Sequence, residues 1–324
     1  MPHSYDYRPE GGLGPRAWTA AVLCLLAAAA GCGAPARPAD GGAAPSSAAA
    51  TVVEEGGQRP AVVPIVRPGR AGQEEDGAVA AGARREEAVR SRLEAVRGWG
   101  LEALPLSAPR PPQARPELTP VQGVSLHEGL PPVVARVPTD DQVVFLTVDD
   151  GVEKDPQFAR MAGALGVPFS AFLADRMARS DYAYFRELAA QGHAVHNHTL
   201  THPDLKLLGY EQQRQEICGQ QDQLERELGT RPRLFRPPYG EYDDTTLRAA
   251  GSCGIEAVPL WNEEAFPDHM EYRYADQRLH PGDIILTHFR GTDLWNGTMP
   301  QMLREVLDTV TAQGFALARL EDYL

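Results

Sequence analysis

Val143-Val-Phe-Leu-Thr-Val-Asp-Asp-Gly151 is the stretch of sequence that decides the fold. Val, Phe and Thr favour the pleated, half-buried surface of a strand. The run stops at Asp149 and Asp150, and Gly151 then permits a sharp exit. In α/β proteins the ligands bind at the carboxyl ends of parallel strands. Asp-Asp-Gly alone is also typical of an ordinary acidic turn, so its interpretation depends on the residues that stand at the ends of the later strands.

From residue 141 onward, strand-like and helix-like segments alternate along the chain. The segments rich in strand formers are 143–148, 167–173, 193–197, 233–236, 255–261, 283–288 and 315–320. Helical periodicity occupies most of the intervals, at 156–165, 181–190, 210–228 and 300–313. The alternation predicts parallel βα units. The pattern leaves open whether these form an open doubly wound sheet or a closed barrel.

The N-terminus has the pattern of an export signal. Ala17–Ala30 is an apolar run preceded by Arg16, and it is too short for a conventional membrane span. Ala29-Ala-Gly-Cys32 resembles the lipobox of bacterial lipoproteins. The resemblance implies that residues 1–31 are a signal peptide and that Cys32 is lipidated, which would anchor the chain to the outer face of the bacterial cell membrane. A plain signal peptide cut at the Ala-rich end is the alternative.

Residues 32–135 are predicted to be a linker between this anchor and a domain at 141–324. Up to about residue 83 the linker is rich in Ala, Gly, Pro and Ser and indicates a disordered tether. A short helix is predicted near 84–98, with Val89, Leu93 and Val96 at helical spacing. The sequence does not decide whether this helix docks on the domain.

Charge and cysteine content bound the function further. The formal net charge of −13, without a basic stripe, argues against nucleic acid as a partner. Cys218 and Cys253 form an even pair in an exported chain, where disulfides persist. We expect a disulfide between them, with two buried thiols as the alternative.

Chemically capable side chains follow several of the predicted strands. They stand in Asp149-Asp150, His198-Thr-Leu-Thr-His202, Arg236-Pro-Pro-Tyr-Gly240, Trp261 and Leu286-Thr-His288. Because the carboxyl ends of parallel strands share one edge, these groups are expected to converge there. Taken singly, each has an ordinary interpretation as a surface pair, a stiffened turn or a core histidine.

His198 and His202 have the spacing of paired zinc ligands. With a carboxylate from a neighbouring strand they would make a set of two histidines and one acid, with metal positions left open. Arg236 could fix an acid by bidentate hydrogen bonds. Since successive residues on a strand point to different sides, Asp149 and Asp150 are expected to divide the work.

In this order the motifs resemble those of the polysaccharide deacetylases, carbohydrate esterase family 4, which share the chitooligosaccharide deacetylase homology domain. The resemblance covers about residues 141–324. It implies an α/β fold, a distorted (β/α)7–8 barrel, and a hydrolase that removes N-acetyl groups from N-acetylglucosamine-type polysaccharide such as peptidoglycan, chitin-like polymer or exopolysaccharide. An acetylated glycan would be the substrate partner.

The resemblance also implies a role for each matching residue. Asp150, His198 and His202 would bind a divalent transition metal, usually Zn²⁺. The catalytic groups would be Asp149 as base, Arg236 as its orienting partner, His288 as acid and the backbone N–H of Tyr239 at the oxyanion. Those lining the substrate pocket would be Pro237, Trp261 and Leu286.

One departure from the family pattern concerns the fifth strand, where an aspartate usually pairs with the acidic histidine. Here Glu263, Glu264 and Asp268 are the candidates, and the sequence does not choose among them. Two alternatives stay open, the first because of this departure and the second because the same site could hydrolyse an ester. The chain could be a non-catalytic or weakly active glycan-binding surface lipoprotein, or an esterase acting on O-acetyl groups of polysaccharide.

Overall fold

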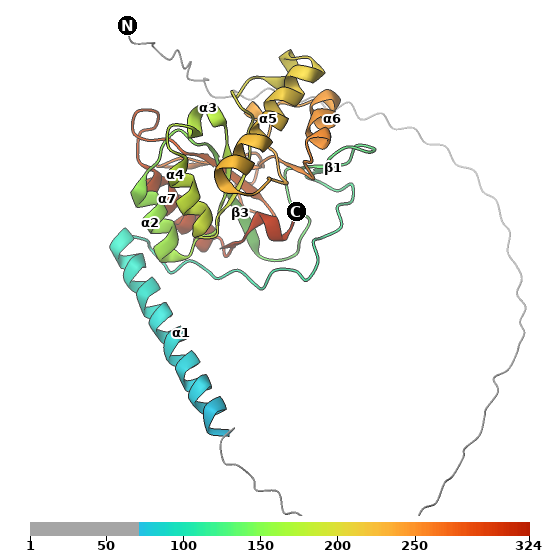
Figure 1. Cartoon of the computed structure of the whole chain (residues 1–324). Coiled ribbons are helices and arrows are strands. Elements are labelled where there is room, and N and C mark those ends of the chain that lie inside the picture. Colours follow the sequence, from blue (N-terminus) through green and yellow to red (C-terminus); the bar gives the residue numbers. More distant parts are fainter. Residues whose placement is uncertain (1–70) are drawn as a thin grey trace, which may run out of the picture. The chain divides into compact units, whose positions relative to one another are not determined.

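The computed structural model describes residues 71–324 (Figure 1). Its helices are α1 (Ala71–Trp99), α2 (Pro156–Leu165), α3 (Asp175–Ala178), α4 (Tyr182–Ala190), α5 (Tyr210–Leu228), α6 (Asp244–Ser252) and α7 (Met299–Ala312), with 3-10 turns η1 (Leu205–Leu207), η2 (Pro238–Gly240) and η3 (Leu320–Asp322). Its strands are β1 (Val124–Ser125), β2 (Val133–Val134), β3 (Val143–Asp150), β4 (Ser170–Leu173), β5 (Ala194–Asn197), β6 (Val258–Pro259), β7 (Glu263–Ala265), β8 (Met270–Tyr272), β9 (Ile284–His288) and β10 (Ala316–Leu317).

The strands form a distorted β/α barrel, and β3 is a central strand of its wall. β3 pairs in parallel with β4 on one side and with β9 on the other, and β4 pairs in parallel with β5. Single parallel bridges continue the ring from Asn197 to Phe235 and from Leu234 to Ala257. The ring closes through β2, which pairs with β6 and is followed by a bridge between Arg136 and Asp283. Of the two architectures that the sequence pattern left open, the structure therefore has the closed barrel and not the open sheet.

Local sequence signals set the helix ends. Asp155 caps α2 by accepting from the backbone N–H of Gln157, Pro156 occupies the first turn, and Gly166 ends the helix at φ 64°. α7 begins with a capping box between Thr298 and Gln301. Figure 1 shows α2, α4 and α7 gathered on one side of β3, and α5 with α6 on the other.

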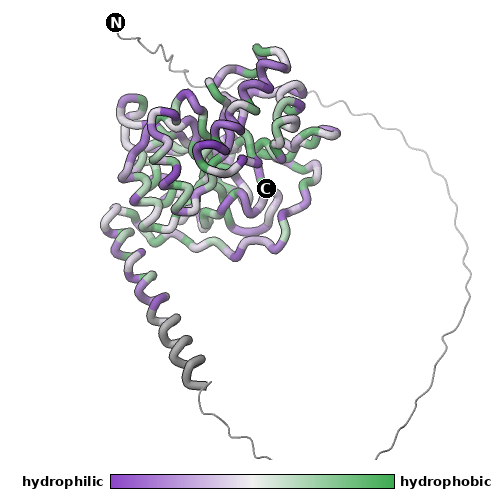
Figure 2. Tube along the Cα trace, in the orientation of Figure 1, coloured by the Kyte–Doolittle hydropathy of each residue, from purple (hydrophilic) through white to green (hydrophobic). Residues whose placement is uncertain are grey.

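The barrel strands supply the core. Every residue of β3, β4 and β6 is buried, which is expected of parallel strands covered on both faces. Figure 2 shows the hydrophilic residues gathered on the outer helices, most clearly along α5. The carboxyl ends of the strands are therefore held rigidly by a packed interior.

The fold begins earlier than the predicted boundary at residue 141. Val96, Leu101, Val133 and Val134 are all buried in the apolar clusters of the barrel or beside them. The helix predicted near 84–98 is the C-terminal part of the longer α1. Its last turn docks on the domain, because Val96, together with Leu101 just after the helix, joins the core that contains residues of α2 and α7.

The structure joins Cys218 of α5 to Cys253, directly after α6, by a disulfide. Cys32 and the predicted signal segment 1–31 lie outside the described residues, as does most of the predicted tether. Within residues 71–324, no helix is long and apolar enough to cross a bilayer.

Candidate metal centre and catalytic site

Asp149 and Asp150 reach the site from the end of β3, but not as strand alternation predicts. Asp150 has φ 76°, a left-handed conformation that breaks the two-residue period. As a result both carboxylates approach the same histidine: Asp149 Oδ2 and Asp150 Oδ1 each lie 3.8 Å from His198 Nε2. The expectation that the two acids point to different sides is therefore wrong.

The two histidines are aimed by a strained loop after β5. The side chain of Asn197 accepts from the backbone N–H of Thr199, and Thr199 Oγ1 accepts from the backbone N–H of His202. Thr199 and His202 have φ values of 73° and 59°. Such conformations persist in non-glycine residues only where the surroundings enforce them, and they cluster at functional sites.

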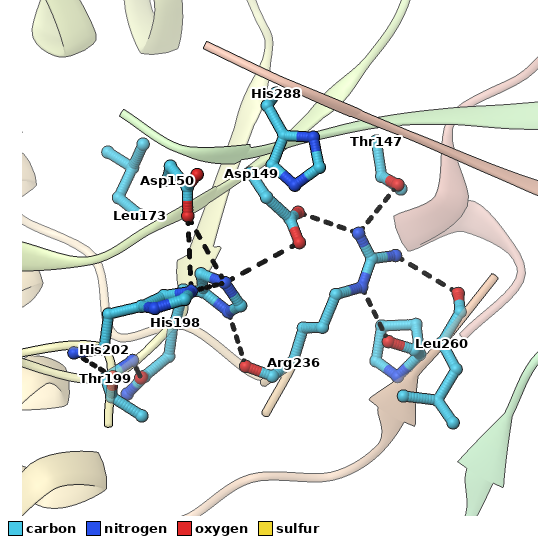
Figure 3. A network of polar contacts seen from close by, with 12 residues as sticks. Thr147, Asp149, Asp150, Leu173, His198, Thr199, His202, Arg236, Leu260 and His288 are labelled. Carbon is cyan, nitrogen blue, oxygen red and sulfur yellow. Dashed lines mark hydrogen bonds and ion pairs between the residues drawn. The ribbon is translucent and has the colours of Figure 1, made fainter. Parts of the chain in front are cut away.

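Asp150, His198 and His202 form a set that could hold a cation. The Nε2 atoms of the histidines lie 3.1 Å apart, and Asp150 Oδ1 lies 3.4 Å from His202 Nε2 and 3.8 Å from His198 Nε2. Ligands that each stand about 2 Å from one zinc ion are separated by roughly 3–4 Å. Figure 3 shows the three side chains turned toward one another.

The donor chemistry also fits a metal. His198 Nδ1–H donates to the carbonyl oxygen of Arg236 at 2.7 Å, which leaves the lone pair on Nε2, as is usual for zinc-binding histidines. Burial lowers the pKa values of His198 and His202 to about 4, so both are neutral at pH 7. Asp150 Oδ1 is buried and has no hydrogen-bond partner, which a bound cation would supply.

Arg236 is fully buried next to Asp149, the acid that is not part of the metal-binding set. Its Nη1 donates to Asp149 Oδ1 at 2.8 Å and to Thr147 Oγ1 at 2.9 Å. Its other nitrogens donate to the carbonyl oxygens of Pro259 and Leu260, and Figure 3 shows the contacts with Thr147, Asp149 and Leu260. The guanidinium also lies 4.4 Å from the ring centre of Phe172. Each nitrogen of the Arg236 guanidinium therefore has an acceptor, which holds the group in a fixed plane, and Arg236 fixes Asp149 in turn.

Asp149 has the ionisation behaviour of a general base. Burial raises its pKa to about 7, against the opposing charge of Arg236. A base is most effective when its pKa lies near the working pH. Asp150 behaves differently: burial opposes its ionisation, but the basic groups around it, His288 first, lower its pKa below the usual range. The two neighbouring acids are thus distinct in charge state as well as in partners.

His288 ends β9 next to Asp149 of β3, and its Nδ1 is buried without a hydrogen-bond partner; Glu264 is the carboxyl that approaches it. The Nδ1 of His288 lies 3.6 Å from Glu264 Oε1. Burial raises the pKa of Glu264 to about 7. Of the three acids that the sequence left open, Glu263 is directed to Asp283 and Asp268 contacts His269 at the surface. The structure therefore selects Glu264.

Aromatic and apolar groups lie around these residues. The rings of His202 and Tyr239 lie 4.8 Å apart, and Tyr239 is 52% exposed. Gly240 packs so closely on Trp261 that an added Cβ would stand 2.9 Å from the indole. Pro237 is buried just before this turn, and Leu286 is buried in β9 beside Thr147. The predicted lining residues thus lie on elements that border the site.

Sequence reasoning missed two contributors to the site. Thr147 holds Arg236 from within β3. Arg290 reaches Asp150 from just beyond β9, with its Nη2 3.2 Å from Oδ2. Arg290 carried a signal that could have been used, namely a charged residue at the same edge as His288.

An acid and two histidines at the carboxyl edge of a β/α barrel, beside a buried base and a histidine, are the arrangement of a metal-dependent hydrolase. Comparison with known proteins gives the family. The profile described as polysaccharide deacetylase matches residues 136–258. The chain belongs to this family, carbohydrate esterase family 4.

Relatives and solved structures agree with this assignment. The chain is 43% identical to an uncharacterised protein of Streptomyces coelicolor, with 63% of this chain and 82% of the relative covered. It is 30% identical to a chitooligosaccharide deacetylase of Sinorhizobium fredii, with 48% and 75% covered. The fold is shared with a family 4 pseudoenzyme from Bacillus anthracis, at a TM-score of 0.51 and 20% identity, with 59% of this chain and 68% of that chain covered.

Proposed function

We propose that the protein is a metal-dependent hydrolase that removes N-acetyl groups from an N-acetylglucosamine-type polysaccharide. The observation that carries the proposal is the convergence of Asp150, His198 and His202 within 3.1 to 3.8 Å of one another. The chitooligosaccharide deacetylase of Sinorhizobium fredii supports the substrate class by similarity.

Zinc is the cation that we propose for this centre, held by Asp150, His198 and His202. When bound, it would lower the pKa of a coordinated water toward about 7 and polarise the amide carbonyl. Asp149 takes the proton of the attacking water, and Arg236 keeps its carboxylate aimed at that position. The backbone N–H of Tyr239 would donate to the developing oxyanion.

The departing amine needs a proton as the C–N bond breaks. We assign this to the pair formed by His288 and Glu264, since His288 alone is neutral: burial and Arg290 lower its pKa to about 3. Glu264, with a pKa of about 7, is partly protonated at pH 7 and lies 3.6 Å from His288 Nδ1. The relay requires this contact to shorten to a hydrogen bond when substrate is bound, as catalytic contacts often do. The products are acetate and a free amino group on the sugar.

The proposal is tested by acetate release from N-acetylated chitooligosaccharides and from peptidoglycan, with zinc present. The matched variant is Asp149→Asn, which keeps the shape of the side chain and removes the base. We expect release by the wild type and a loss of about 10²–10⁴-fold in the variant. Absence of release from both glycans, or equal release by the variant, would exclude the proposed function.

A second candidate function is glycan binding without efficient chemistry. Glu264 favours it, because its distance of 3.6 Å from His288 Nδ1 is too long for a hydrogen bond. Glycan binding measured by calorimetry, together with no acetate release, would support this function. Release from acetylated xylan but not from chitooligosaccharides would instead indicate an O-acetyl esterase.

We also propose that Cys32 is lipidated and holds the domain at the outer face of a bacterial membrane. Two acyl chains anchor a protein stably, whereas one chain does not. Expression of the full chain and of Cys32→Ser, followed by separation of membranes, tests this. We expect the variant to leave the membrane fraction. Retention of both at equal levels would argue for another mode of attachment.

A further inference from the structure

Arg290 lies just beyond the end of β9 and reaches back to the metal-binding acid. Its Nη2 is 3.2 Å from Asp150 Oδ2, and the two side chains are 19% and 4% exposed. It also lies close enough to His288, His202 and Glu264 to affect the pKa of each. Arg290 therefore occupies the interior of the site rather than its rim.

The contact distinguishes the two oxygens of Asp150. Oδ1 faces the histidines and has no hydrogen bond, whereas Oδ2 is held by Arg290. The terminal torsion of an aspartate is soft, so a carboxylate without such a contact can turn either oxygen inward. Asp150 also departs from strand geometry at φ 76°. The direction of the Asp150 carboxylate therefore depends on the contacts that its side chain makes.

We propose that Arg290 is a positioning residue of the metal centre: by holding Oδ2 of Asp150, it presents Oδ1, together with His198 and His202, to a divalent cation. The inference rests on the metal site of the proposed function. Partners that hold a ligating carboxylate commonly matter for metal affinity, and their loss costs about 10–100-fold.

Arg236 performs the corresponding task on Asp149, which it contacts at 2.8 Å. The two adjacent acids thus each have their own arginine, one for the ligand and one for the base. The guanidinium of Arg290 also repels a cation, which works against binding. We expect the positioning effect to outweigh this repulsion, because Arg290 donates to Oδ2 of Asp150, whereas Oδ1 is the oxygen that faces the histidines.

The test compares zinc affinity of the purified full chain with that of Arg290→Gln, by competition with a chromogenic chelator. We expect affinity to fall about 10–100-fold, and the absorption bands of bound Co²⁺ to shift. Arg290→Lys keeps the charge but loses the planar fork, so its affinity should also fall. Arg231→Gln removes an arginine from the exposed pairs with Asp222 and Glu225 and should bind zinc like the wild type.

The outcomes separate this inference from the proposed function. Affinity of Arg290→Gln equal to or tighter than that of the wild type would overturn the inference and leave the deacetylase proposal standing. Wild-type affinity in Arg290→Lys would assign the effect to charge and would also overturn it. A wild type that binds no zinc would overturn both proposals. Circular dichroism of each variant ensures that folded proteins are compared.

Discussion

Arg236 Nη1 lies 2.8 Å from Asp149 Oδ1, and neither side chain is more than 3% exposed. An ion pair at such depth is weak evidence for stability as a whole, because removing two charges from water is costly. Breaking the pair is a different matter. Loss of one partner leaves the other charge buried without compensation, so the geometry of the base and the stability of the barrel are linked.

Arg236→Met tests that link. We expect it to lower the free energy of unfolding by about 3–5 kcal/mol, since Asp149 would be left buried without its partner. Denaturation in urea, followed by circular dichroism, measures the change. The control is Arg233→Met, which breaks a half-exposed pair with Glu256 and should cost about 0–1 kcal/mol. Equal losses in the two variants would contradict the prediction.

Glu264→Gln tests the assignment of the acid that serves His288. We expect kcat for deacetylation to fall about 10²-fold or more with little change in KM, because proton supply to the leaving amine is removed. The control is Glu225→Gln on α5, whose side chain is 54% exposed, and which should retain wild-type kcat. If Glu264→Gln keeps the wild-type rate, His288 is protonated by another route.

The parts of the site that the sequence predicted depend only on the pattern of strand-forming residues and on the polar residues that follow them. β3 follows from a run of strand formers, and Asp149, His198, Arg236 and His288 follow because parallel strands end at a common edge. The alternation of strands and helices did not decide between a closed barrel and an open sheet. Closure of the barrel depends on bridges of one or two residues and on β2, which is too short to give a pattern.

Other features depend on tertiary contacts. The direction of Asp150 follows from a positive φ that local sequence does not encode. β7 was missed because Glu263 and Glu264 are poor strand formers. The strand exists because β7 pairs with β9 and β8, and burial raises the pKa of Glu263 to about 9 beside Asp283. Such a carboxyl is neutral at pH 7 and is therefore tolerated inside a strand.

Glu321 gives the stability of the fold a predictable acid dependence. Burial opposes its ionisation, but the hydrogen bonds from His196 and Ser170 outweigh burial and lower its pKa to about 2, from an ordinary 4.5. A carboxyl with a depressed folded-state pKa stabilises the protein above its unfolded pKa, and that contribution is lost as the pH falls through the folded value. We therefore expect the loss between pH 4.5 and 2.

Unfolding free energies of the wild type and of Glu321→Gln over this pH range measure the contribution. The wild type should lose on the order of 3 kcal/mol more than the variant, because a tenfold difference in proton affinity between the folded and unfolded states corresponds to about 1.4 kcal/mol. Glu305→Gln, at a partly buried position on α7, is the control and should follow the wild-type curve. Parallel curves for the wild type and Glu321→Gln would show that the contact is not linked to acid stability.

The disulfide between Cys218 and Cys253 joins the two helices on one side of the barrel, across 35 residues of chain. That interval contains Arg236 and Tyr239, so the bridge shortens the unfolded loop that carries part of the site. Replacing both cysteines by serine should lower the free energy of unfolding by about 2–4 kcal/mol, chiefly through the greater freedom of the unfolded chain.

Urea denaturation of the oxidised wild type, the reduced wild type and the double variant measures this. The reduced wild type should match the variant, and acetate release below the unfolding transition should change little, because neither sulfur contacts the metal-binding residues. Equal stability of the oxidised protein and the variant would mean that the packing of α5 on α6, rather than the bridge, holds this side of the barrel.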